Sequence, residues 1–286
     1  MKKGEYGLLL ILLFFMLCKN SSAEEKDTVW VKEKSAKYVV VGAGSGQASI
    51  RDYGTSPLVY SGVFPLLNLG YEQSSRKAVF QLNLCSSLGN YNRKIFEKPF
   101  EIKAYEFEFK TSYLRAIHIK ENKQQIWLMG GGIIHQTSIR IAEQFLNSGF
   151  VVDNISHLCA EFGFRKFFHQ SARARKIGRI TFKRPDRNFL FQSLIRLPVV
   201  SSFYRPGYVF IANGTKEDYK VFEQYHLNFL SFRGLFFSNS FSRLMRNGNS
   251  IRLSYDWSVV TSGNKLPNRL ELARHYLQLS LFFRIN

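Results

Sequence analysis

The sequence predicts an all-β protein, and more precisely a transmembrane, up-and-down antiparallel β-barrel. Segments of roughly ten residues between Tyr38 and Phe283 alternate apolar and polar side chains, as barrel strands do when one face meets lipid and the other meets water. A secretory signal precedes these segments. Aromatic residues make up 15% of the chain, with 27 Phe and 14 Tyr, which suits the lipid-facing belt of such a barrel.

Residues 1–23 are predicted to form a cleaved signal peptide. Two lysines precede an apolar run from Leu8 to Leu17, and the small residues Ser21 and Ala23 have the spacing that a signal peptidase requires. Lipid attachment at Cys18 is the alternative, but the bulky Leu17 stands before it. No apolar run reaches the length of about 20 residues that a membrane helix needs. Residues 24–286 are therefore expected to form a single barrel domain.

The mature chain is strongly basic. The whole chain has 40 Lys and Arg against 21 Asp and Glu, and removal of Lys2, Lys3, Lys19 and Glu5 leaves 37 against 20, a net charge of +17. Such an excess implies an anionic neighbour. Nucleic acid is not expected, because the basic residues form no recognisable binding module and the chain is exported. Outer-membrane lipid head groups are the expected partners, with contacts from Arg93, Lys94, Arg173, Arg175 and Lys176.

Six strands are predicted in the first part of the mature chain. The fourth is the clearest, because Tyr105, Phe107 and Phe109 alternate with Glu106 and Glu108, a separation that a helical period of 3.6 does not produce. The segments Gly89 to Pro99 and Ile139 to Asp153 are expected to be loops, the second with a possible short helix. The six strands are expected near Tyr38–Ile50, Val59–Tyr71, Ala78–Ser87, Tyr105–Tyr113, Gln124–Ser138 and His157–Arg165.

The second part is expected to hold a further six strands. Pro198 and Pro206 are interpreted as turns or strand ends, because proline cannot donate to a sheet ladder. Single-chain bacterial barrels have even strand numbers, so the count is expected to be twelve, with ten as the alternative. These strands are expected at Ile177–Lys183 and Asn188–Leu197, from Tyr208, and at Phe222–Gly234, Ile251–Val259 and Leu277–Ile285.

The glycines Gly42, Gly44 and Gly46 follow three valines and resemble the turn of a dinucleotide-binding fold. That motif needs a helix after the glycines and an acidic residue about 20 positions further on. Here Gly54 and Pro57 interrupt the next segment, and no acid stands near Gly62 to Leu67. No cofactor is therefore expected, and the glycines are interpreted as one face of a strand that leaves room for neighbours.

Histidine and serine suggest lipid hydrolysis, but no catalytic or metal site is predicted. His135 and Ser138 are three residues apart, so on a regular strand their side chains point to opposite faces. The charged and histidine side chains on inward positions are instead expected to form a polar network that plugs the lumen. This set comprises Glu106, Glu108, Lys110, His157, Glu161, Arg165, Arg196, His226, Arg252, Asp256 and Arg284. Whether Cys85 and Cys159 form a disulfide is left open.

Several short segments resemble uncharacterised outer-membrane barrels of the Bacteroidota. They are Tyr60-Ser61-Gly62, Leu69-Gly70-Tyr71-Glu72, Arg205-Pro206-Gly207-Tyr208, Asn247-Gly248-Asn249 and the closing segment Leu277 to Arg284. The resemblance covers nearly all of the mature chain and implies location and fold, but no site residues. The last strand is also similar to the terminal strand that the barrel-assembly machinery reads, with a late aromatic residue at Phe283.

These observations predict an integral outer-membrane barrel of a Gram-negative bacterium. The expected role is that of a non-enzymatic structural or accessory component, which engages anionic lipid or other outer-membrane or periplasmic proteins. A narrow channel for a small solute and a lipid hydrolase or acyltransferase are the alternatives.

Overall fold

The computed structural model describes residues 35–53, 56–95, 98–119, 124–142, 150–177, 180–205, 225–229, 233–262 and 269–285. The predicted signal peptide lies outside these residues. The described chain forms strands throughout, and no helix in it is long and apolar enough to cross a membrane. The strands are β1 Ala36–Asp52, β2 Ser56–Ser74, β3 Ala78–Ile95, β4 Lys98–Ile119, β5 Gln125–Ile141, β6 Phe150–Gln170, β7 Arg173–Ile177, β8 Ile180–Arg184, β9 Arg187–Tyr204, β10 Tyr225–Phe229, β11 Gly234–Leu244, β12 Ser250–Ser262 and β13 Leu270–Ile285.

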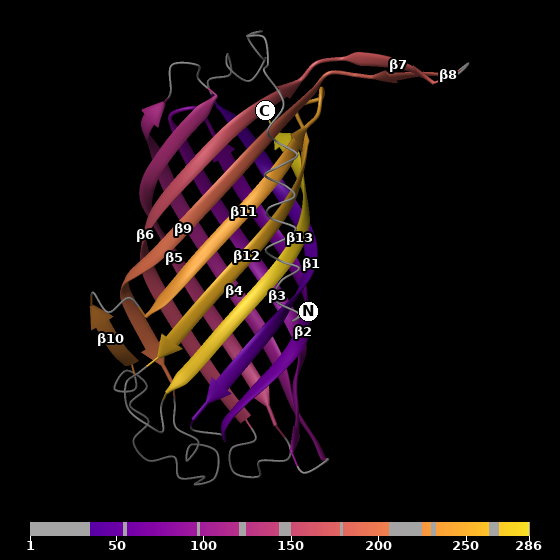
Figure 1. Cartoon of the computed structure of the whole chain (residues 1–286). Coiled ribbons are helices and arrows are strands. Elements are labelled where there is room, and N and C mark those ends of the chain that lie inside the picture. The colour runs from indigo at the N-terminus through magenta and orange to yellow at the C-terminus, as the bar shows by residue number, and fades with distance from the viewer. Residues whose placement is uncertain are drawn as a thin grey trace, which may run out of the picture.

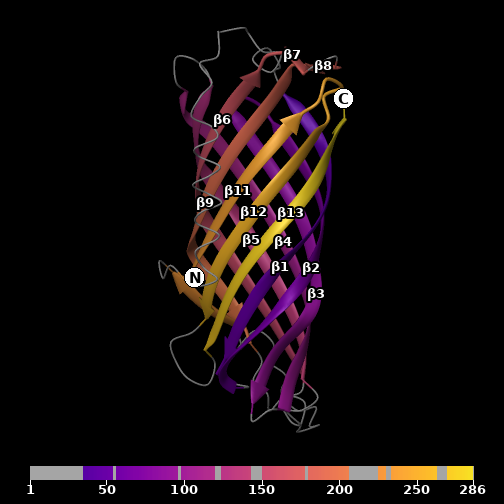
Figure 2. The same cartoon turned by 45° about the vertical axis from the view of Figure 1, so that its right-hand side comes forward.

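Ten of these strands form a closed antiparallel barrel whose strands are inclined to its axis (Figures 1 and 2). The order around the wall is β9, β11, β12, β13, β1, β2, β3, β4, β5, β6, and the pairing of β6 with β9 closes the ring. In a closed ring, the backbone donors and acceptors of every strand find partners, which is the condition for spanning lipid with strands. The predicted fold class is therefore confirmed.

Within the described residues the barrel wall has ten strands, so the preferred expectation of twelve is wrong and the alternative of ten is right. The predicted strand Ile177–Lys183 falls in the short hairpin of β7 and β8, which pair with each other and project beyond the barrel (Figure 1). The strand β10 pairs only with Val200–Tyr204 of β9. The strand predicted to begin near Tyr208 lies outside the described residues.

Pro198 does not end a strand, contrary to the sequence-based interpretation. The strand β9 continues through it from Arg187 to Tyr204. Its pairing with β6 shifts register at this point, since Leu158 pairs with Val200 while Cys159 pairs with Pro198. The bulge provides a place for a residue that has no N–H to give to the ladder.

Two predicted loops are wrong, because their turn-forming residues belong to strands in the structure. The segment Gly89 to Pro99 is not a loop, since β3 continues to Ile95 and β4 begins at Lys98 with continuous register. Much of Ile139 to Asp153 also belongs to β5 and β6, with residues 143–149 outside the described chain. The strand β11 was missed because its sequence, GLFFSNSFSRL, breaks the alternation with two adjacent Phe residues.

The two ends of the barrel differ. At the end called here the terminal end, β1 begins and β13 finishes, and Lys37 pairs with Ile285. The hairpin of β7 and β8 leaves the wall at this same end (Figure 1). The opposite end, called the far end, contains the end of β1 at Asp52 and its partner Leu270.

The outer surface is apolar and the inner surface is polar, as the alternation predicts. On β13, Leu277, Leu279, Leu281 and Phe283 are 42–55% exposed, whereas the alternate residues Gln278 and Ser280 are buried inside. Similar exposed rows occur on the other long strands and include Val63, Leu67, Leu69, Leu84, Leu88, Tyr105, Phe107, Met129, Ile133, Leu158, Phe162 and Leu253. In water, such a large exposed apolar surface would favour aggregation.

The glycine face of β1 allows a neighbouring strand to approach closely. A Cβ atom at Gly46 would overlap the carbonyl oxygen of His275 on β13, and one at Gly44 would overlap that of Leu277. These positions therefore exclude any side chain, because the obstacle is backbone and cannot rotate away. The interpretation of the glycines as a strand face is confirmed.

Candidate functional site

The lumen is the candidate functional site, because ionisable side chains fill it over its length. Ten charged residues are buried in the described chain, and they comprise five carboxylates and five guanidiniums. These are Asp52, Glu72, Glu106, Asp153 and Glu161, with Arg140, Arg165, Arg196, Arg205 and Arg274. Buried charges persist only when they are paired and hydrogen-bonded, so the equal numbers have a physical basis.

Four of these residues form a closed ring of ion pairs at the far end, called here the far-end quartet. Arg140 on β5 pairs with Asp52 on β1 at 2.9 Å and also with Asp153 on β6. Arg205, which follows β9, pairs with the same two carboxylates at 2.9 Å each. Each carboxylate thus meets both guanidiniums, and the ring joins strands from opposite sides of the wall.

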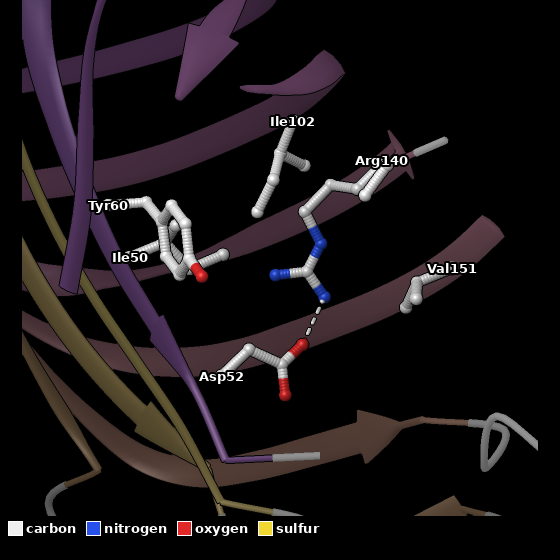
Figure 3. A pocket seen from close by; sticks show the side chains of 7 residues that line it. Ile50, Asp52, Tyr60, Ile102, Arg140 and Val151 are labelled. Carbon is white, nitrogen blue, oxygen red and sulfur yellow. Dashed lines mark hydrogen bonds and ion pairs between the residues drawn. The ribbon is translucent and has the colours of Figure 1, made fainter. Parts of the chain in front are cut away.

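The apolar surroundings of the quartet hold almost no free space. Figure 3 shows Arg140 and Asp52 pointing toward each other, with Ile50, Tyr60 and Ile102 beside them. The cavity at this place measures about 10 Å³, which is at most the room of one water molecule. The quartet and its apolar neighbours therefore pack tightly at the far end of the lumen.

A second group, called here the central cluster, surrounds the carboxylates of Glu106 and Glu108 on β4. Arg274 on β13 pairs with Glu106 at 3.0 Å, and the hydroxyl of Tyr91 donates to the same carboxylate at 2.8 Å. Lys110 pairs with Glu108 at 2.5 Å, and the Gln136 amide donates to Glu108 at 2.6 Å. Every carboxylate of the cluster has both a cation and a neutral donor, which makes such a network stable when buried.

Glu161 on β6 extends the central cluster across the lumen. It accepts from the guanidinium of Arg196 on β9 at 3.1 Å and from the hydroxyl of Ser112 on β4. The strand β5 lies between β4 and β6, so the contact of Ser112 with Glu161 passes over β5 on the lumen side. This contact links β4 and β6, which do not pair with each other.

The third group, called here the terminal cluster, surrounds Glu72 on β2. Arg252 on β12 donates to both carboxylate oxygens of Glu72, at 2.8 and 3.2 Å. Gln81 donates to Glu72 at 2.8 Å, and the guanidinium of Arg165 lies 3.6 Å from it. A bidentate arginine is the strongest common geometry for a carboxylate, so this cluster holds β2 and β12 together across the lumen.

A polar cavity of about 80 Å³ separates the terminal cluster from the central cluster. Its lining includes Glu72, Lys110, Arg196, Arg252 and Asp256. A water molecule needs roughly 10–15 Å³ of such space, so the cavity has room for about five to eight waters. It is a polar cavity within the network of ion pairs.

His157 is buried completely on the lumen side of β6. Its Nδ1 lies 2.8 Å from the hydroxyl of Ser201, and Phe203 and Phe236 pack edge-on against its ring. Its Nε2 has no hydrogen-bond partner. The residue thus belongs to the packed interior, and no substrate reaches it in this conformation.

The structure brings most of the predicted lumen residues together. Glu106, Glu108 and Lys110 share the central cluster with the pair of Glu161 and Arg196. Arg165 and Arg252 instead meet Glu72, which the sequence analysis did not select.

The remaining predicted residues are dispersed. Asp256 lines the cavity without joining either cluster directly. Arg284 lies at the rim, where its side chain approaches Gly248. The side chain of His226 lies outside the described residues.

Among the predicted head-group contacts, only Arg93 has a described side chain. Its guanidinium donates to the backbone carbonyl of Val59 at 2.9 Å, so part of its donor capacity binds the wall. The side chains of Lys94, Arg173, Arg175 and Lys176 lie outside the described residues.

The far-end quartet was missed entirely. Its members are Asp52, Arg140, Asp153 and Arg205, and each stands at or near the end of a strand, where the sequence analysis expected turns and loops. Glu72 and Arg274 were missed for the same reason. Continuing the alternation one to four residues beyond the apparent strands would have placed Asp52, Glu72, Arg140, Asp153 and Arg274 on inward positions, whereas the bulge after Pro198 changes the alternation before Arg205.

Cys85 and Cys159 are both free and buried. Cys85 on β3 lies 3.4 Å from the side-chain oxygen of Asn68, while Cys159 is on β6. In the described part of the chain, no group of three or more His, Cys, Asp or Glu side chains is placed to hold a metal ion.

Comparison with known proteins gives only distant structural likenesses. No family model and no curated protein matches the chain. The chain is similar to the translocator domain of the autotransporter NalP from Neisseria meningitidis, with 8% identity, 88% of this chain and 89% of that chain covered, and a TM-score of 0.37. It is also similar to the toluene transporter TodX from Pseudomonas putida, with 7% identity, 90% and 91% covered, and a TM-score of 0.30. At these scores the likenesses support no argument, and the fold assignment follows from the closed strand order itself.

Proposed function

We propose that the protein is an integral outer-membrane β-barrel with a closed lumen, which acts from its surface as a structural or accessory component. The observation that carries this proposal is the lumen network of the far-end quartet, the central cluster and the terminal cluster. Charged groups cross the interior at three levels and are almost wholly buried. A general pore needs a continuous aqueous path, and these ion pairs occupy that path.

Location in a membrane is supported by the outer surface. The rows of exposed Leu, Val and Phe encircle a wall whose backbone hydrogen bonds are internally satisfied. The aromatic residues Tyr255 and Trp257 stand on β12 with His275 beside them, and the Tyr255 hydroxyl lies 2.7 Å from the His275 Nδ1. Aromatic rings with polar tips are typical of the lipid–water interface.

Contact with anionic head groups or acidic partners is supported by the charge balance. The buried lumen set is neutral, so the excess of basic residues in the mature chain must lie elsewhere, on the rims, loops and exposed wall. Basic rims attract the phosphates of lipid head groups by about 1 kcal/mol per residue near the surface. The candidate contacts remain Arg93, Lys94, Arg173, Arg175 and Lys176.

Planar-bilayer recording of the purified full chain tests the closed lumen. We expect no stable conductance after insertion has been verified by resistance of the barrel to alkaline extraction from vesicles. Stable single-channel steps from the unmodified protein would contradict the closed lumen and would favour the narrow channel instead.

Lipid retention tests the surface role. Replacement of Arg173, Arg175 and Lys176 by Gln should at least halve the anionic lipid that copurifies in mild detergent, measured as phosphate per protein. A matched control replaces Lys37, Arg115 and Arg243 on the wall strands β1, β4 and β11, all exposed, and should retain more lipid than the hairpin variant. Equal retention by the wild type and the hairpin variant would remove the hairpin from the proposal.

A further inference from the structure

The outer wall of β5 and β6 has a group of polar side chains within its apolar surface. His135 and Thr137 stand on β5, and their register partners Ser156 and Asn154 stand on β6. The intervening residues Ile134, Gln136, Ile155 and His157 are buried in the lumen, so the four polar side chains face outward. This group, His135, Thr137, Asn154 and Ser156, is called here the wall cluster.

The four side chains form one continuous chain of hydrogen bonds. Nδ1 of His135 lies 2.8 Å from Oγ of Ser156, and Nε2 lies 3.3 Å from Oγ1 of Thr137. Oγ1 of Thr137 lies in turn 2.7 Å from Oδ1 of Asn154.

For a neutral imidazole, and with the Asn154 amide oriented as in the structure, these contacts allow one arrangement of protons. The amide oxygen of Asn154 can only accept, so the Thr137 hydroxyl must donate to it. The Thr137 oxygen can then only accept from His135, which places the imidazole proton on Nε2. Nδ1 is left as an unprotonated acceptor for the Ser156 hydroxyl. The histidine is therefore held in the tautomer that a general base for this serine requires.

The surroundings of the wall cluster suit a membrane lipid. On β4, the Phe107 and Phe109 backbones pair with Thr137 and His135, and Phe107 is largely exposed. Exposed Ile133 and Leu158 continue the apolar surface toward the terminal end. Tyr105 and then Lys103 follow on β4 toward the far end, and both are exposed. An acyl chain on the apolar side and a head group on the Tyr105 side would bring the ester linkage to the wall cluster.

A polar cluster on a lipid-facing wall has a free-energy cost that a structural role does not explain. Polar and ionisable groups within a membrane are rare and mark functional sites by default. We propose that the wall cluster hydrolyses acyl esters of membrane lipids, with Ser156 as nucleophile and His135 as general base.

In the first step, Oγ of Ser156 would bond to the ester carbonyl carbon while Nδ1 of His135 takes the hydroxyl proton. The bond from that carbon to the alcohol oxygen breaks, and the departing alcohol receives the proton from Nδ1. In the second step, a water molecule from the interface attacks the acyl-serine with His135 again taking a proton. The fatty acid leaves, and the proton returns to Ser156. Thr137 and Asn154 are positioning residues that keep the required tautomer.

The test uses the full mature chain folded in phospholipid vesicles of phosphatidylethanolamine and phosphatidylglycerol. Released fatty acid is quantified, and a fluorophosphonate probe reports a reactive serine. The wild type should release fatty acid and take up the probe. Ser156→Ala should lose both, and His135→Ala should release fatty acid at least 100-fold more slowly, since a general base contributes about 10²–10⁴-fold.

A matched control is His275→Ala on the opposite wall. His275 also faces outward and bonds a hydroxyl, but that hydroxyl belongs to Tyr255, and its register partners are Trp257 and Gln47 rather than serine. This variant should keep activity within twofold of the wild type. Thr137→Val should lower kcat with little change in KM and should shift the pH dependence of the rate, because the histidine tautomer is no longer held.

Folding of every variant is checked by the heat-dependent migration of the barrel on a gel. Where Ser156→Ala does not fold, Ser156→Cys keeps the side-chain size and should still lose the fluorophosphonate label. Absence of both label and fatty acid release from folded wild type overturns the proposal, as does labelling that persists in folded Ser156→Ala. Neither result changes the conductance expected of the lumen, so failure here and failure of the closed-lumen proposal are separate outcomes.

Discussion

Neutralising Asp153 should destabilise the barrel more than any change to an exposed ion pair. The side chain is 1% exposed and accepts from both Arg140 and Arg205. In Asp153→Asn, the two guanidiniums lose one of the two buried carboxylates that they share, and Asp52 is the remaining carboxylate of the quartet. Breaking a buried pair on one side typically costs about 3–5 kcal/mol. We therefore expect the free energy of unfolding to fall by about 3 kcal/mol or more.

The assay is reversible urea unfolding of the barrel in vesicles, followed by tryptophan fluorescence. Glu271→Gln is the matched control, because Glu271 pairs with Arg51 at 3.4 Å and with Arg269, but its side chain is 30% exposed. Exposed pairs contribute about 1 kcal/mol or less. Removing Arg205 as well as Asp153 should restore part of the loss, since the quartet then again has one guanidinium for one carboxylate. A loss of under about 1 kcal/mol in Asp153→Asn, or one equal to that of the control, would refute the reasoning.

Three further changes test the wall. Gly46→Ala should prevent stable barrel formation, because a Cβ would overlap the carbonyl oxygen of His275, whereas Gly163→Ala meets only atoms at 3.4–3.6 Å and should fold normally; gel migration before and after heating distinguishes them. Leu279→Arg should lower the free energy of unfolding by about 2–4 kcal/mol, because this side chain is 54% exposed and faces lipid; an unchanged value would place it in water. Gly248→Ala should cost about 1–2 kcal/mol in the same measurement, since its φ of 86° disfavours a Cβ, and an unaltered midpoint would contradict the turn geometry.

The alternation of apolar and polar residues predicted many of the wall strands correctly. The wrong predictions concern segments where that alternation is interrupted. The row of Leu277, Leu279 and Leu281 predicted its own outward face correctly. Pro198 was misread because a bulge in β9 itself, defined only by its pairing with β6, accommodates it. The strand β11 was missed because adjacent Phe236 and Phe237 hide its alternation.

The candidate sites were less accessible to sequence reasoning. His135 was compared only with Ser138 of its own strand, and that pair does face opposite ways. Its actual partner, Ser156, is 21 positions away and becomes a neighbour only through the register of β5 with β6. Asp52 and Arg140 are 88 positions apart and meet only because the sheet closes.

The amino-acid sequence by itself determined that this chain forms strands with one apolar and one polar face. Successive side chains of an extended backbone point to opposite faces, and this is a local property. The sequence also determined the strongly positive net charge of the chain. Only the tertiary structure decided the number of strands in the ring and the partner of each ionisable group. Register and closure depend on all ten strands at once, and a shift of one residue in any ladder would send every side chain of that strand to the other face.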